Sequence, residues 1–242
     1  MERTTKQKYL SAAGLLLVAT AAVKVIGAVY KIPLTGLIGG TGRGYFSTAY
    51  TLFMPVHAIT LGAFPVALSG LVSKYHATGD SARVAALQRS ARGLFFWVGL
   101  AGTALMVLLA GPYTRLVAGA PKAVYTVLIL APTALFSAMA AAHRAFAEGH
   151  LNMVPTSVCQ VLEALFKMVF GLLFAKLSMG RLYQIYLDTG MVLGNRAESE
   201  TAALSMMYPV TAACAMLGVT LGALVAWVYA ALYDRFWYPH RL

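Results

Sequence analysis

The chain has 242 residues, of which 60% are hydrophobic and only 11% are charged. Soluble domains carry roughly 25% charged residues, so a soluble fold of this length lacks the polar surface that it needs. The net charge of +11 comes from basic residues scattered singly between apolar runs, without the dense basic patch of a nucleic-acid-binding protein. Composition and charge argue against both classes and predict an integral membrane protein that binds no nucleic acid.

Six apolar runs approach or exceed the ~20 residues that a helix needs to cross ~30 Å of hydrocarbon. In chain order they cover residues 9–30, 45–72, 93–110, 123–146, 153–177 and 203–232. The first run follows Arg3, Lys6 and Lys8, as in a secretory signal, but its length and the similar runs behind it favour a retained span. We predict one all-α polytopic domain over residues 1–242, a bundle of about six transmembrane helices in the inner (plasma) membrane.

Three polar or glycine-rich stretches separate these runs. Residues 39–44 superficially resemble a phosphate-binding loop, but no strand precedes them and the Walker lysine is missing, so we predict a tight turn. Asp80 and Ser81 are expected to cap a short interfacial helix within residues 73–92. Residues 178–201 form the longest polar stretch and are expected to be a loop.

Basic residues predict how the chain is oriented in the membrane. Lys74, Arg83, Arg89 and Arg92 cluster after the second apolar run. Cytoplasmic segments carry an excess of Lys and Arg, so this cluster is expected on the cytoplasmic side. An even number of spans places both termini on one side, and we expect both in the cytoplasm.

Charged residues within the apolar runs are the candidates for substrate binding. Lys24 lies in the first run, and Glu163 and Lys167 lie one helical turn apart in the fifth, at a similar expected depth. Each costs at least ~2.5–3.5 kcal/mol near the bilayer centre, so all three are expected to face a bundle interior or a watery cavity. In one interpretation Glu163 neutralises Lys167, and Lys24 reaches outward to the interface. The interpretation that we favour is a cationic cavity for an anionic substrate, with Lys31 and Arg43 at its outer mouth, although these two also suit simple interfacial anchoring.

Other residues suggest packing rather than chemistry. Gly218 and Gly222 form a small-xxx-small face on the sixth run, which is typical of helix packing. The histidines and cysteines do not form a set with metal-ligand spacing. No acid, base and nucleophile can be assembled within the membrane segments. We therefore expect no catalytic residue, no metal, no cofactor and no enzyme activity.

Four segments carry a family resemblance: residues 24–34, residues 39–44 with Ala49 and Tyr50, residues 62–75, and residues 160–167. Their order and spacing resemble the stage V sporulation protein B family, and the resemblance extends to about Tyr233. These proteins are polysaccharide-type flippases of the multidrug/oligosaccharidyl-lipid/polysaccharide superfamily, related to the lipid II flippase. The resemblance implies that a polyprenyl-diphosphate-linked saccharide is flipped by alternating access for cell-wall or polysaccharide synthesis. It also places Lys24 where the family carries a basic residue in its cavity.

The resemblance covers one lobe of a fold that has two. We expect a truncated product, and pairing of two copies or a separate partner chain are the alternatives. Membrane lipids and the lipid-linked saccharide are the other expected partners. Two alternatives remain for function, namely a cation-coupled multidrug exporter of the same superfamily and an inactive membrane fragment or scaffold.

Overall fold

The computed structural model describes the backbone of residues 2–237 and the side chains of residues 14–237. The side chains of Arg3, Lys6 and Lys8 lie outside the described residues. The described chain is almost entirely helical, which confirms the all-α membrane fold.

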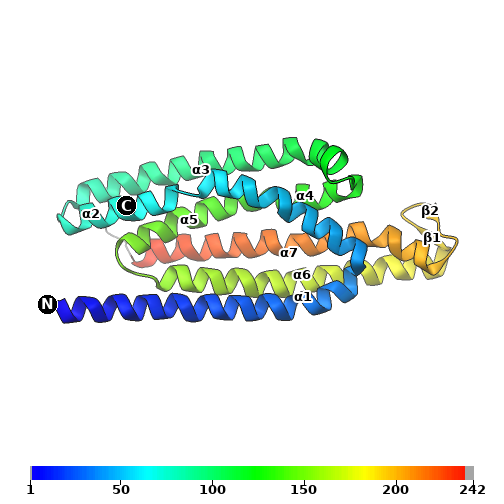
Figure 1. Cartoon of the computed structure of the whole chain (residues 1–242), viewed down its shortest axis with the longest axis horizontal. Helices are drawn as coiled ribbons and strands as arrows, with labels where there is room; N and C mark the ends of the chain where they lie inside the picture. The colour runs from blue at the N-terminus through cyan, green and yellow to red at the C-terminus, as the bar shows by residue number, and fades with distance from the viewer. Residues whose placement is uncertain (1, 238–242) are drawn as a thin grey trace.

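The helices lie alongside one another in one elongated bundle (Figure 1). A π-helical turn, Tyr113–Val117, extends α3, and a 3-10 turn, Pro121–Ala123, precedes α4. In chain order the α-helices and strands are α1 (Glu2–Leu61), α2 (Phe64–Ala77), α3 (Ser81–Pro112), α4 (Val124–Leu130), α5 (Thr133–Gly149), α6 (Val154–Thr189), the antiparallel strands β1 (Met191–Val192) and β2 (Asn195–Arg196), and α7 (Glu200–Trp237).

Within the described residues, five helical segments are long and apolar enough to cross a membrane. The first, Gly14–Ala77, has 64 residues, on the order of 100 Å of helix and roughly three times the hydrocarbon thickness. The predicted runs over residues 9–30 and 45–72 both lie on this segment, except that the first begins in the turns of α1 before Gly14. The other four segments are Ser81–Val117, Pro121–Gly149, Val154–Thr189 and Glu200–Trp237.

The long first segment reverses direction at Gly39. This residue has φ 63° and ψ −178°, a conformation that is open essentially to glycine alone. A Cβ here would also lie 2.6 Å from Cζ of Tyr208 on α7. Figure 1 shows α1 leaving the N-terminal end of the bundle, bending, and returning with α2 to the same end. The turn predicted over residues 39–44 is therefore shorter than expected, because residues 40–44 are helical.

The residues after the second run form a long helix rather than a short interfacial one. Asp80 does cap a helix, since its carboxylate accepts the backbone N–H of Arg83 at 3.0 Å. That helix is α3 itself, so the predicted separate interfacial helix is wrong. The physical reason is a continuous buried face, in which Val84, Ala91 and Phe95 recur at helical spacing and join one apolar cluster.

The predicted polar loop is also mostly helical. Residues 178–189 continue α6. The non-helical part of this stretch is residues 190–199, which contain the β1–β2 hairpin. Buried Val192 and Met207 pack with Met179 and Tyr183 in a small cluster between the ends of α6 and α7. These apolar contacts support helix where the composition suggested a loop.

Helices α6 and α7 approach each other closely at small residues. Gly218 abuts the backbone of Gly171 and the carbonyl of Lys167. A Cβ on Gly222 would lie 2.7 Å from the carbonyl oxygen of Glu163. Both glycines therefore serve helix packing, as their spacing predicted.

A buried ionic cluster joins α3, α5 and α7 at the end of the bundle where α7 ends. Asp234 is only 4% exposed, and its Oδ2 accepts hydrogen bonds from Gln88 Nε2 at 2.8 Å, Arg92 at 3.1 Å and His143 Nδ1 at 2.8 Å. The sequence assigned Arg92 to the basic cluster expected on the cytoplasmic side. In the structure this arginine also balances a buried carboxylate.

We expect Gly218→Ala to destabilise the protein by about 1–3 kcal/mol, because the new methyl group would meet backbone atoms that cannot move aside. Thermal unfolding in detergent measures the effect. Gly180→Ala is the matched control on α6, since nothing lies within 4 Å of the position of its Cβ. The control should be neutral or slightly stabilising. Equal melting temperatures for both variants would contradict the close approach.

We expect Asp234→Asn to destabilise the protein by roughly 3 kcal/mol, because it leaves the Arg92 charge without its counter-ion. The exposed Asp188→Asn on α6 is the control and should melt like the parent protein. If the melting temperature of Asp234→Asn matches that of Asp188→Asn, the cluster does not hold these helices together.

Candidate functional site: a cationic cavity between α1 and α6

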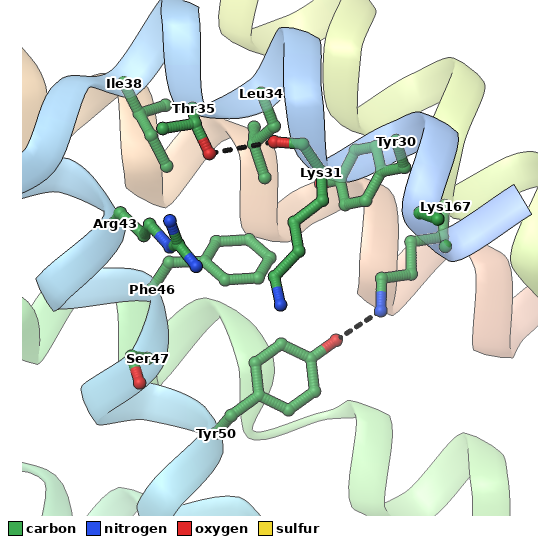
Figure 2. A pocket seen from close by; sticks show the side chains of 12 residues that line it. Tyr30, Lys31, Leu34, Thr35, Ile38, Arg43, Phe46, Ser47, Tyr50 and Lys167 are labelled. Carbon is green, nitrogen blue, oxygen red and sulfur yellow. Dashed lines mark hydrogen bonds between the residues drawn. The ribbon is translucent and has the colours of Figure 1, made fainter. Parts of the chain in front are cut away.

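A cavity of about 600 Å³ lies between the two arms of α1 and helix α6 (Figure 2). Residues 27–38 of the first arm and residues 43–50 of the second each contribute positions spaced three or four apart, so each arm presents one helical face. The bend at Gly39 turns these two faces toward one another. The lining residues are Gly27, Ala28, Tyr30, Lys31, Leu34, Thr35, Ile38, Arg43, Phe46, Ser47, Tyr50 and Lys167.

The charges that line this cavity are positive. Lys31, Arg43 and Lys167 belong to the lining, which contains no Asp or Glu among the side chains that the structure describes. Figure 2 shows these three side chains converging on the space between the arms. Lys31 and Arg43 are exposed and, within residues 14–237, take part in no ion pair. Their charges are therefore free to meet an anion.

Lys167 is held by aromatic side chains rather than by a carboxylate. Its Nζ donates a hydrogen bond to the Tyr50 hydroxyl at 2.9 Å. It also lies 5.0 Å from the ring centroid of Tyr50 and 5.9 Å from that of Tyr30. Within the described side chains, Lys167 makes no ion pair with Glu163. The arrangement in which Glu163 neutralises Lys167 is thus not the one that the structure adopts.

Glu163 faces a second, smaller cavity of about 220 Å³. Lys167, Tyr30 and Gly27 line both cavities, so they form the wall between them. Gln160 and Glu163 give the smaller cavity an amide and a carboxylate. The acidic residue and the cationic cavity therefore lie on opposite sides of one lysine.

The structure does not bring Lys24 into either of these cavities. Lys24 is exposed and lies on the same face of α1 as Ala28 and Lys31, four and seven residues away. Seven residues of helix place it about 10 Å from Lys31 along the axis. A role for Lys24 in substrate binding remains a prediction.

Comparison with known proteins identifies the family of this chain. Residues 10–188 match the family described as polysaccharide biosynthesis protein. This chain belongs to that family. Two proteins of Bacillus subtilis (strain 168) are similar to it: the lipid II flippase MurJ, 28% identical over 174 residues, and stage V sporulation protein B, 25% identical over 158 residues.

The matches to the lipid II flippase MurJ and to stage V sporulation protein B cover 67% and 65% of this chain, respectively. They cover only 31% and 30% of the two relatives, so the chain spans less than a third of the length of the curated relatives that it matches. No solved structure gives a significant match. The family and the membrane fold are therefore shown, and the resemblance to stage V sporulation protein B is confirmed. The family match ends at residue 188, short of the predicted extent to Tyr233.

Sequence reasoning missed the role of Tyr30 and Tyr50 in this family member. Both lie in segments that carry the family resemblance, but neither is charged, so neither was a candidate. The spacing of Arg43, Ser47 and Tyr50 placed all three on one helical face. That signal becomes useful once the bend at Gly39 is known.

We expect Ser47→Cys, in a chain without Cys159 and Cys214, to react with a water-soluble thiol reagent. An anionic methanethiosulfonate should react faster than a cationic one, because the cavity lining is positive. Ala49→Cys is the control on the same arm, since Ala49 is 0% exposed, and it should stay unlabelled. Equal rates for the two reagents at Ser47→Cys would contradict a cationic cavity.

Proposed function

We propose that this chain forms one lobe of a membrane flippase that translocates a polyprenyl-diphosphate-linked saccharide. The observation that carries the proposal is the cavity in which Lys31, Arg43 and Lys167 meet without a carboxylate. The diphosphate of such a lipid carries the negative charge that these cations match. Lys24 would meet the diphosphate along the same face of α1, beyond the cavity itself.

The chemistry of the lining suits a diphosphate. An arginine presents a planar fork of donors to two phosphate oxygens, and each lysine supplies up to three N–H donors. Charge interactions in a partly dehydrated cavity are stronger than in bulk water. About 600 Å³ is also within the range of small-molecule sites, roughly 300–1,000 Å³.

Family membership supports the same substrate class. One relative is named a lipid II flippase, and the family is described by polysaccharide biosynthesis. A cation-coupled drug exporter is less compatible with the cavity, because a cationic drug would meet three positive side chains and no carboxylate there.

Translocation needs two states that expose the cavity to opposite sides of the membrane. Among the described side chains, those that line the cavity all come from α1 and α6. We propose that a second lobe, from another chain or a second copy, closes the remaining side. We propose that both termini of this chain face the cytoplasm, on the same side as the cluster of Lys74, Arg83, Arg89 and Arg92.

We expect Lys167→Gln and Arg43→Gln each to weaken binding of geranyl diphosphate to the purified protein by about 10- to 100-fold, the value of one charge-assisted hydrogen bond. The exposed Lys122→Gln, which lies outside both cavities, is the matched control and should bind like the parent protein. Titration calorimetry in detergent measures the affinities.

A complementation assay extends the binding test to transport. Cells depleted of their lipid II flippase should regain growth with the chain and its partner lobe, and lose it with Lys167→Gln. Binding that is equally strong in Lys167→Gln, Arg43→Gln and Lys122→Gln would rule out the cavity as the diphosphate site.

A further inference from the structure

The side chain of Lys167 lies between two cavities of opposite character. On one side the larger cavity presents Lys31 and Arg43, and on the other the smaller cavity presents Glu163. Lys167 is flexible and has three donors on its ammonium group. Its rotamer therefore decides whether its charge adds to the cationic cavity or is cancelled by the carboxylate.

The partner that Lys167 has in the structure leaves its charge available. A phenol hydroxyl accepts one hydrogen bond from the ammonium, and the faces of Tyr50 and Tyr30 add cation–π attraction. These neutral groups replace part of the lost hydration without cancelling the charge. A carboxylate would form a charge-assisted pair and remove the attraction for an incoming anion.

The two acceptors differ in how they are attached to the fold. Glu163 lies four residues before Lys167 on α6, so their separation is fixed by one rigid helix. Tyr50 lies on the second arm of α1, so its distance from Lys167 depends on how α1 sits against α6. A displacement of that arm changes the distance from Tyr50 to Lys167. It leaves the Cα–Cα distance from Glu163 to Lys167 unchanged.

We propose that Tyr50 is a positioning residue which holds Lys167 on the anion-binding side, and that Glu163 receives Lys167 when the arm of α1 moves away. This inference rests on the proposed function and supplies a release step for it. When the arm leaves, the ammonium pairs with Glu163, the positive charge of the larger cavity falls by one, and a bound diphosphate is held less tightly. No proton is transferred, because the ammonium keeps its charge in both positions.

A double-mutant cycle on the purified protein tests the exchange. With geranyl diphosphate as the probe, Tyr50→Phe should weaken binding about tenfold, because Lys167 then turns to Glu163. Adding Glu163→Gln should restore most of the affinity, since the competing carboxylate is gone. Tyr125→Phe, an exposed tyrosine that is 63% accessible on α4, controls for loss of a hydroxyl and should leave the affinity unchanged.

A purely structural role for Tyr50 predicts a different result. Glu163→Gln would then fail to rescue Tyr50→Phe, and the double variant would bind as weakly as the single variant or more weakly. That outcome overturns the proposal.

A measurement without any ligand separates this inference from the proposed function. The NMR signal of ¹³C-methylated Lys167, assigned by its loss in Lys167→Arg, should shift in Tyr50→Phe and return toward its original position in Tyr50→Phe with Glu163→Gln. If this pattern appears but no variant binds the diphosphate probe, the proposed function fails and the exchange stands. If Glu163→Gln does not affect the signal in the Tyr50→Phe background, the exchange is wrong whatever the binding results.

Discussion

Three helices meet at Gly171, where the packing leaves no room for a side chain. A Cβ there would lie 2.6 Å from the Tyr30 hydroxyl on α1 and 3.2 Å from the carbonyl oxygen of Ala215 on α7. Lys167 lies one helical turn before Gly171 on α6. The contact that fixes α6 against its neighbours therefore also fixes Lys167 beside the Tyr30 ring. Backbone packing sets the position of this cation before any polar contact forms, since tightly packed interiors allow little local movement.

Three like charges can share this cavity because only one of them, that of Lys167, is partly buried. Lys31 and Arg43 are exposed, so hydration and salt weaken their mutual repulsion. Lys167 is half-buried, and it alone has a hydrogen bond and two aromatic faces to offset its lost hydration. The bend at Gly39 makes the combination possible, because it turns Lys31 and Arg43 on successive arms toward the same space.

The sequence was sufficient for the membrane class and the approximate positions of the apolar segments, since soluble folds rarely contain several long, uniformly apolar runs. Contacts between residues far apart in the sequence could not be predicted from it. The rule for residues four apart suggested Glu163 as the partner of Lys167, whereas the partner is Tyr50, 117 positions away. Arg92 belonged to the basic cluster expected on the cytoplasmic side, and its contact with Asp234, 142 positions away, was not predicted. Polar residues after Leu177 suggested a loop, although apolar contacts between α6 and α7 extend the helix.

The ionic cluster and the cationic cavity belong to different sets of helices. Asp234 ties α7 to α3 and α5, whereas the cavity is bounded by α1 and α6. Within residues 14–237, the Lys167–Tyr50 contact is the one side-chain hydrogen bond that joins α1 to another helix. A movement of the second arm of α1 therefore breaks one hydrogen bond and no ion pair. Because that bond involves the most buried cation of the cavity, a movement of this arm also changes the charge presented to an anion, at the cost of the apolar contacts that Leu52, Phe53 and Val56 make in the core.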